Sequence, residues 1–531
     1  MVWKVQSSIS GGTKLSVSQE SEYRSCCNQL HKLSQEFDSL SSQWMQAASR
    51  IMANSLSKNS CEGPLCNTNN SLTTSLTYDQ CEMNSKECKR FSEKLFELSV
   101  LLSRANSLYS EAERASKQLF DNVVSLGFTF APATAIPIFV YAGISIFKDS
   151  TTPNSNMRNF AKWSHNTAPL QQGLIKGLSQ HFIINPITGL PLRWLNSIQK
   201  TKSLFKNGKF SFGFSNLNSP LARVSGGLSS ISSRINNLWQ GNKLTVTKVN
   251  IPKKSYKNIL PKKGQTIGEA FTNITELSNG NIGVKPPLVN SEAATVAIQC
   301  FRKPDGSKSW LVTIPGTDGK PHSPFGWEQN AEVMSENKIS RTQADSTRMV
   351  IEAMRKAGIN KNDSVAIIGH SQGGIVAASI ASDYSEEYNI QHVITAGSPI
   401  ANHPIPKKTW VTSVEMDDEL VPSLDGKSNP SRNNWVTISA KTTHYGNEKN
   451  KDDKRNKKSK SSKDSYNVSG TTVKGVPESG TLSHDLHYHC AAYEDASALG
   501  SRAIRSQEEH FENIVSGKLE STTLWQGTVN K

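Results

Sequence analysis

The chain has 531 residues and a formal net charge of +15, and its length is typical of two or three domains. Hydrophobic residues make up 36% of it, enough for a packed core, and a mean hydropathy of −0.47 excludes a polytopic membrane protein. Residues 148–257 contain sixteen basic residues and one acidic residue, so this block carries the whole charge excess. The chain is therefore modular and is not a uniformly basic nucleic-acid binder.

The N-terminal part of the chain has a helical pattern. Its first residues, MVWKVQSSIS, lack the continuous apolar run of a secretory signal peptide. Apolar residues at helical spacing then form two stripes, from Leu30 to Ile51 and from Phe91 to Leu119. Because neither stripe can be left in water, we predict an antiparallel helical hairpin over 1–121 that closes around 57–76. The alternative is two helices that pack on another part of the chain.

Six of the eight cysteines lie in this region, without the Cys-x-x-Cys pair or the histidine partner that a metal site needs. We favour disulfides for them over buried free thiols. These cysteines are Cys26, Cys27, Cys61, Cys66, Cys81 and Cys88.

An uncharged segment and then a basic segment follow the hairpin. Residues 122–147 carry no charge and are long enough to span a bilayer as a helix, although Pro132 and Pro137 predict a kink. The basic block 148–257 begins directly after them, as expected beside an anionic membrane surface. The alternative for 122–147 is a buried connector, and the alternative for 148–257 is a solvated linker. We expect a membrane-associated, extracytoplasmic or secreted protein without a cleavable signal peptide, with a cytoplasmic location left open.

Residues 258–531 have the pattern of an α/β catalytic domain, with one further strand just before them. Strands alternate with helices, which predicts a mostly parallel sheet flanked by helices, of the α/β-hydrolase type, after the helical hairpin. Residues 441–464 have nine basic and four acidic residues and predict a disordered polar insertion. The predicted strands are 244–249, 294–301, 310–314, 364–368, 392–395 and 410–414, and the predicted helices are 341–356, 373–384 and the region 486–514.

The most informative motif is Gly369-His370-Ser371-Gln372-Gly373, which joins an apolar strand to a helix of small residues. This Gly-x-Ser-x-Gly pattern predicts a nucleophile elbow, in which a sharp turn presents the hydroxyl of Ser371. The next backbone N–H, that of Gln372, then faces an oxyanion formed at the serine. A second donor is expected after the strand 310–314, from the backbone N–H of Thr317 or Asp318.

A serine nucleophile needs a base and an acid, which follow it in this chain order in such folds. Acids come directly after the strand 410–414, at the edge of the sheet where a triad acid belongs. We favour Asp418 because its Asp-x-x-Val-Pro context lets the chain turn away immediately afterwards. Asp417 is the first alternative and Glu415 the second.

The base is expected among the histidines near the end of the chain. We favour His484 because Asp485 can begin a helix and leave His484 on the preceding loop. His489 is the first alternative, His487 the next, and His444 lies inside the predicted insertion. The three clustered histidines share no helix face, so we expect no metal, and the reaction requires no cofactor.

Five short strings within residues 312–438, taken together in their order along the chain, resemble a family of α/β-hydrolases from Gram-positive bacteria that is similar to the lipase and esterase group. The resemblance implies Ser371 as nucleophile, an acid at 417–418 and a histidine within 484–489. The hairpin more loosely resembles those of type VII secretion substrates, although it has no Trp-x-Gly turn. The strings are Val-Thr-Ile-Pro-Gly-Thr (312–317), Gly-His-Ser-Gln-Gly-Gly (369–374), Thr-Ala-Gly-Ser-Pro-Ile-Ala (395–401), Asp-Asp-Glu-Leu-Val-Pro (417–422) and Asn-Trp-Val-Thr-Ile (434–438).

The sequence therefore predicts a serine hydrolase that cleaves lipid or acyl esters through Ser371, Asp418 and His484. Its expected partners are the ester substrate, an anionic membrane surface and a secretion partner of the hairpin, with no nucleic acid. A toxin-like effector that attacks target membranes is one alternative. A non-catalytic surface protein that retains the fold is the other.

Overall fold

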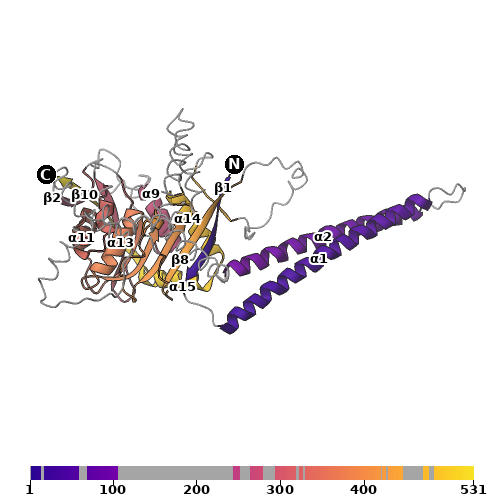
Figure 1. Ribbon diagram of the computed structural model, residues 1–531, viewed down its shortest axis with the longest axis horizontal. Coiled ribbons are helices and arrows are strands. Elements are labelled where there is room, and N and C mark those ends of the chain that lie inside the picture. Colours follow the sequence, from indigo (N-terminus) through magenta and orange to yellow (C-terminus); the bar gives the residue numbers. More distant parts are fainter. Residues whose placement is uncertain are drawn as a thin grey trace, which may run out of the picture. The chain divides into compact units, whose positions relative to one another are not determined.

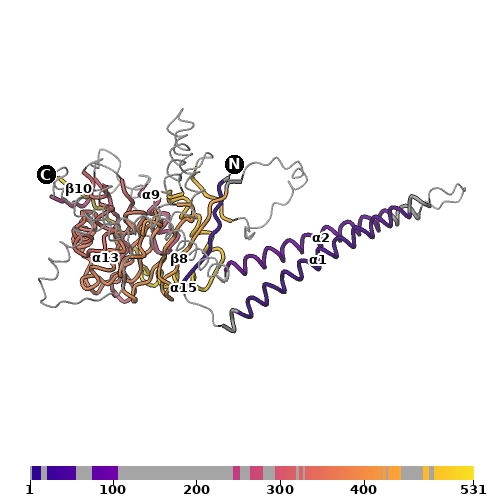
Figure 2. The backbone as a smooth tube through the Cα atoms, in the orientation of Figure 1, coloured from indigo at the N-terminus to yellow at the C-terminus, as the bar shows by residue number. Residues whose placement is uncertain are grey.

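The described residues of a computed structural model form two compact units, a sheet covered by helices and a pair of long helices (Figures 1 and 2). The uncharged segment 122–147, residues 148–242 of the basic block and residues 446–464 of the polar insertion lie outside the described residues. The structure describes residues 2–12, 17–58, 69–105, 243–250, 264–278, 293–318, 322–326, 329–419, 421–425, 428–445, 470–476 and 483–530.

One mixed sheet of ten strands runs through the first unit in the order β2-β10-β3-β4-β5-β6-β7-β8-β1-β9. Its centre, from β4 to β8, is parallel, and the outer pairs are antiparallel. The predicted α/β sheet flanked by helices is confirmed, and its parallel part is the core of central strands. The strands are β1 (Val2–Gly11), β2 (Lys243–Lys248), β3 (Ala294–Arg302), β4 (Lys308–Ile314), β5 (Ser364–His370), β6 (Asn389–Ala396), β7 (Trp410–Met416), β8 (Trp435–Tyr445), β9 (Thr471–Thr472) and β10 (Lys518–Asn530).

Helices cover both faces of this sheet. The predicted helix 341–356 is divided at Ala344 into two, and the region 486–514 is divided near Gly500. The helices of this unit are α9 (Ile267–Ser278), α10 (Gln329–Val333), α11 (Lys338–Gln343), α12 (Asp345–Ala357), α13 (Gln372–Asp383), α14 (Leu486–Ala498) and α15 (Arg502–Ile514), with a 3-10 turn η3 at Pro422–Asp425.

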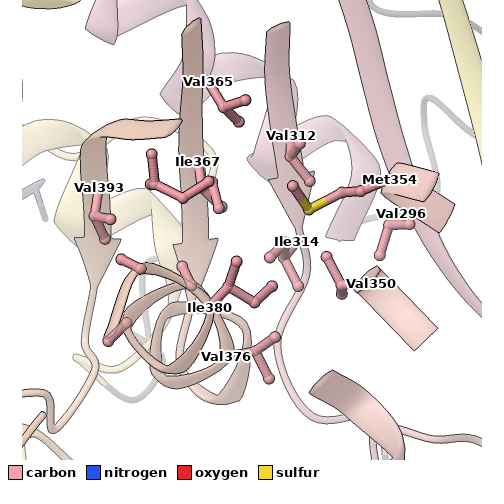
Figure 3. Packing of buried hydrophobic residues seen from close by; sticks show 14 of the residues in the cluster. Val296, Val312, Ile314, Val350, Met354, Val365, Ile367, Val376, Ile380 and Val393 are labelled. Atoms are coloured by element: carbon pink, nitrogen blue, oxygen red, sulfur yellow. The ribbon is translucent and has the colours of Figure 1, made fainter. Parts of the chain in front are cut away.

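Strand β5 shows how alternation divides the core into two layers. Val365 and Ile367 face one side and pack with α12 and α13, as Figure 3 shows for Ile367 and Ile380. Ala366 and Ile368 face the other side and join the residues of α9, α14 and α15. Because both faces of the strand are buried, its sequence is continuously apolar rather than alternating.

The first strand belongs to the sheet and not to the hairpin, so the predicted domain boundaries differ from those of the structure. Residues 2–11, which the sequence analysis assigns to the hairpin, form β1 and pair with the whole of β8, from Val2 opposite Tyr445 to Gly11 opposite Val436. Strand β2, assigned to the basic connector, likewise pairs with β10. Each strand has a partner hundreds of residues away, so local sequence patterns could not connect them.

The same pairing corrects the predicted insertion at 441–464. Residues 441–445 are the last part of β8 and are ordered by β1, with Lys441 opposite Gln6 and His444 opposite Trp3. Charged and polar side chains are tolerated here because a strand in a sheet can satisfy its backbone while it presents one face outward.

The second unit confirms the predicted hairpin. Helices α1 (Val17–Lys58) and α2 (Asn69–Ala105) pack against each other, and Figure 1 shows them running in opposite directions. The antiparallel direction follows from the cross-helix pairs, because Ser34 meets Ser92 whereas Ser41, one heptad later, meets Ser85.

Small residues are the most deeply buried side chains in the seam between α1 and α2, and part of each predicted apolar stripe lies outside it. Ser34, Ser41, Ser85 and Ser92 are buried and hydrogen-bonded across the seam. Leu33, Leu40, Trp44, Phe91 and Leu98 of the predicted stripes are instead exposed. Small side chains allow the helices to approach closely, and the serines satisfy one another, so burial carries no unpaired hydroxyl.

The preference for disulfides is wrong for the four hairpin cysteines that the structure describes. Cys26, Cys27, Cys81 and Cys88 are free thiols, while Cys61 and Cys66 lie outside the described residues. Cys81 and Cys88 are seven residues apart on one helix, about 10 Å along its axis, which is beyond the reach of a disulfide.

Among the helices within the described ranges, none combines the length and the apolar composition that a bilayer span needs. The segment for which a span was predicted, 122–147, is outside these ranges.

Strand β1 generates a prediction about stability. Val5 and Ile9 have no exposed surface, and Ser7 donates to Asp495 Oδ2 of α14 through its backbone N–H (2.8 Å) and its Oγ (2.6 Å). We expect Ile9→Ala to lower the free energy of unfolding by about 2–5 kcal/mol, because it leaves a cavity in the core. Urea unfolding followed by tryptophan fluorescence measures the change. Gln6→Ala, on the exposed side of the same strand, is the control, and equal stability of the two variants would contradict the placement of β1.

Candidate active site

The parallel register brings the ends of four central strands to one edge of the sheet. Ile314 of β4 lies opposite Gly369 of β5, and His370 lies opposite Ala396 of β6. Strand β7 ends two residues beyond Val414, which lies opposite Ala396. Residues that directly follow these strands are therefore neighbours, although the sequence separates them widely.

Ser371 lies at the turn between β5 and α13. Its φ of 52° and ψ of −122° make it the one non-glycine residue with positive φ among those described. A Cβ on Gly369 would lie 2.3 Å from Gly373, and a Cβ on Gly373 would lie 2.3 Å from the carbonyl oxygen of Ile314. Both motif glycines are thus required by close backbone contacts, and the turn has the strained geometry of a nucleophile elbow.

His484 lies directly against this serine. Its Nε2 is 2.9 Å from Ser371 Oγ, and its side chain is 26% exposed. Asp485 caps α14 by accepting a hydrogen bond from the backbone N–H of His487, so His484 occupies the loop just before the helix. The structure therefore brings together the serine and the histidine that the sequence favoured.

The acid beside His484 is Glu419 and not Asp418. Glu419 Oε1 lies 3.1 Å from His484 Nδ1, and the glutamate side chain has no exposed surface. The carboxylate of Asp418 instead accepts a hydrogen bond from Thr442 Oγ1 of β8. The turn after β7 directs Asp418 toward the neighbouring strand, and the longer side chain of Glu419 reaches the histidine.

The remaining candidates for the acid and for the base contact residues other than Ser371 and His484. Glu415 accepts hydrogen bonds from Asn429 and from Ser413. Asp417 uses its backbone N–H to bond the carbonyl of Ala440. His487 Nδ1 lies 2.7 Å from Asp485 Oδ1, and His444 belongs to β8, where it lies opposite Trp3 of β1.

His489, the first alternative for the base, contacts the acid rather than the serine. Its Nε2 forms an ion pair with Glu419 Oε2 at 2.9 Å, and neither side chain has any exposed surface. Burial by itself would raise the pKa of Glu419, but the charges of His489 and His484 outweigh it and lower that pKa to about 2. Glu419 is thus a carboxylate shared by two histidines.

The pH dependence of this ion pair follows from the two shifts. Burial would lower the pKa of His489, but the adjacent Glu419 outweighs it and raises that pKa above 6.5. The lowered pKa of Glu419 stabilises the fold fully above about pH 4.5, and this contribution is lost as pH falls toward 2. The raised pKa of His489 stabilises it fully below 6.5, and this contribution is lost as pH rises through the raised value. Both contributions are present between about pH 4.5 and 6.5.

Gly397, directly after β6, makes room for this cluster. Its φ is +60°, and a Cβ there would lie 2.5 Å from Glu419 Oε1, 2.9 Å from His489 Nε2 and 3.0 Å from His484 Nδ1. A side chain at this position would therefore displace the carboxylate or one of the histidines.

The two expected oxyanion donors belong to segments that meet beside the serine. Thr317 Oγ1 donates to Gln372 Oε1 at 3.3 Å, and Asn330 Nδ2 donates to Thr317 Oγ1 at 3.3 Å. A Cβ on Gly316 would lie 3.2 Å from Ser371 Cβ, which shows how closely the chain after β4 passes the elbow.

Glu419 and Gly397 are not among the site residues predicted from the sequence. The signal for Glu419 was weak, because it is the third acid in Asp417-Asp418-Glu419 and only the turn decides which of them faces the histidine. Gly397 lies in the string Thr-Ala-Gly-Ser-Pro, but its purpose is apparent only when Glu419 and His489 are seen against it.

Comparison with known proteins agrees with this part of the fold. No curated protein and no solved structure matches the chain. Residues 327–478, well under half of the chain, match the model of the PGAP1-like alpha/beta domain family. The matched region contains Ser371 and Glu419, and His484 follows it by six residues. The C-terminal half of this protein thus contains a PGAP1-like alpha/beta domain.

Proposed function

We propose that the protein is a serine hydrolase that cleaves carboxylic esters through Ser371, His484 and Glu419. The observation that carries the proposal is the continuous line of contacts from Ser371 Oγ to His484 Nε2, and from His484 Nδ1 to Glu419 Oε1. A nucleophile, a base and a carboxylate that orients the base are the three parts such catalysis needs.

The reaction follows from these contacts. His484 Nε2 takes the proton of Ser371, and Oγ attacks the ester carbonyl carbon. The backbone N–H groups of Gln372 and Thr317 stabilise the resulting oxyanion, and His484 returns the proton to the departing alcohol. Water then attacks the acyl group with the same help, and the acid leaves. Glu419 accepts the Nδ1–H of His484 throughout and stabilises its charged form.

The proposed substrates are lipid or acyl esters. The resemblance of the elbow and its neighbouring strings to lipases and esterases supports this class. The uncharged segment 122–147 and the basic block 148–257 would bring the chain to an anionic membrane, where such esters occur. Membrane association, and a secretion partner for the hairpin, remain predictions from the sequence, as does a toxin-like role at target membranes.

A non-catalytic protein that retains the fold is the contrasting proposal. It would need no base in contact with the serine and no strain at Ser371. The described geometry favours the enzyme, because a positive φ at a serine costs free energy that a purely structural turn could avoid with glycine.

Ser371→Ala is expected to abolish labelling by a fluorophosphonate probe and to lower the hydrolysis of p-nitrophenyl esters by roughly 10³–10⁶-fold. Esters of rising chain length, assayed with the wild type, report the preferred acyl group. Ser382→Ala, on the same helix α13 with its Oγ bonded to the carbonyl of Ala378, is the control. An inactive wild type, or activity that survives Ser371→Ala, would overturn the proposal.

Variants of two neighbouring acids distinguish the proposed triad, with Glu419, from the one favoured by the sequence, with Asp418. Glu419→Gln should lower kcat roughly 10²–10⁴-fold, because His484 loses the carboxylate that orients it. Asp418→Asn should retain most activity, since the new amide oxygen can still accept the hydrogen bond from Thr442. Steady-state kinetics on one p-nitrophenyl ester measures both. The opposite ranking would restore Asp418 as the acid.

Gly397→Ala tests the geometry of the cluster without changing any reacting group. We expect kcat to fall about tenfold or more, because the new methyl group pushes the carboxylate of Glu419 away from His484. Gly500→Ala is a matched control, since its φ of +64° gives the same backbone strain but no heavy atom lies within 4 Å of the added Cβ. Equal activity of the two variants would contradict the close packing at Gly397.

A further inference from the structure

His489 is a second histidine on the acid of the proposed triad, and the proposed mechanism leaves it without a role. It lies on α14, one turn beyond His484, and its side chain is completely buried. Its Nε2 lies 2.9 Å from Glu419 Oε2, and its Nδ1 lies 3.2 Å from the backbone carbonyl oxygen of Asp485.

The two neighbours of the His489 ring determine where its protons lie. A carbonyl oxygen can only accept, so Nδ1 carries a hydrogen that it donates to Asp485. A neutral ring would then present the lone pair of Nε2 to a buried carboxylate oxygen, which is repulsive at 2.9 Å. The approach of Nε2 to Oε2 does not have the direction of a hydrogen bond, so the two groups interact by charge at 2.9 Å. This contact is attractive only when the ring carries hydrogens on both nitrogens, and such a ring is an imidazolium.

The other groups around His489 are consistent with this charge. His370, at the end of β5, has its ring centroid 5.9 Å away, and its Nε2 donates to the backbone carbonyl of His484 at 3.0 Å. Burial, together with the two neighbouring histidines, lowers the pKa of His370 well below 6.5, so it is neutral. The carboxylate of Asp485 pairs with His487. Glu419 is therefore the anion that His489 balances.

We propose that His489 is a buried imidazolium and a positioning residue that holds Glu419 between two histidines and offsets part of the negative charge that faces His484. This inference rests on the proposed hydrolase function. The pair of Glu419 and His489 is neutral as a whole, so a proton added to His484 gains less attraction than it would from a lone carboxylate. At the same time His489 fixes Oε2, which leaves Oε1 directed at His484 Nδ1.

His489→Gln removes the positive charge and keeps a polar side chain beside Glu419. The Gln amide can donate to Glu419, so the carboxylate keeps a partner, but the positive charge about 6 Å from His484 is removed. We expect the acid limb of the pH profile of kcat/KM to move up by about one pH unit, because His484 then binds its proton more tightly. A merely structural role would lower activity without moving this limb. His487→Gln, two residues away on the same helix, is the control and should leave the limb in place.

A second measurement reads the charge directly and does not require activity. In the full-length protein labelled with ¹⁵N-histidine, we expect one ring to keep both nitrogens protonated at pH 7.5, and its signal to be lost in His489→Gln. If that variant does not fold, His489→Asn provides the assignment, and the wild-type spectrum alone still shows whether an imidazolium persists at this pH.

The outcomes separate this inference from the proposed function. A wild type that neither hydrolyses esters nor reacts with fluorophosphonate overturns the proposed function. An active wild type whose acid limb stays in place in His489→Gln overturns the role of His489 alone. Neutral rings for every histidine at pH 7.5 overturn the imidazolium whatever the activity.

Discussion

The buried carboxylate of Glu419 is the constraint on which the site depends. An ion removed from water costs several kcal/mol unless it is paired, and the side chain of Glu419 has no exposed surface. Its two oxygens are matched one to one by His484 and His489. Each element that supplies a partner must therefore be held in place, and the absent side chain of Gly397 leaves the space in which all three groups meet.

Helix α14 supplies His489, and the loop directly before it supplies His484, so the position of α14 decides the geometry at the serine. Asp485 caps its first turn, and Asp495 near its end binds β1 through the backbone and the hydroxyl of Ser7. The ring of Trp3 packs edge-on against Tyr488 at 6.2 Å between centroids. Strand β1 thus helps to hold α14, and with it a histidine more than 470 residues later in the chain.

The contact between α1 and α2 rests on other interactions than the apolar core around the sheet. Its seam is lined by serines and small residues whose hydroxyl groups bond across it, and Phe37 and Phe91 meet at its side with 5.7 Å between ring centroids. Hydroxyl pairs of this kind contribute little net free energy but leave no buried group unsatisfied. The apolar periodicity of the sequence therefore identified the two helices correctly but not the buried serines at the centre of the face by which they meet.

Local sequence patterns were sufficient wherever the determining interactions are local. The nucleophile elbow, the strands that precede it, and the helix start at Asp485 follow from apolar runs, glycine positions and a capping residue. Consequently the positions of Ser371 and His484 relative to their elements could be predicted, and the structure brings the two side chains together.

Long-range contacts decided the choice of the acid, the pairing of β1 and the need for glycine at position 397. The choice of Glu419 over Asp418 depends on a turn whose direction is set by Thr442 on a neighbouring strand. Strand β1 is ordered by β8, and Gly397 is required by side chains that come from two other segments. The sequence by itself determined which chemical groups the site would contain and where in the chain they lie. Only the tertiary structure decided which carboxylate faces which histidine, because a buried charge is placed by all the segments that surround it and not by its neighbours along the chain.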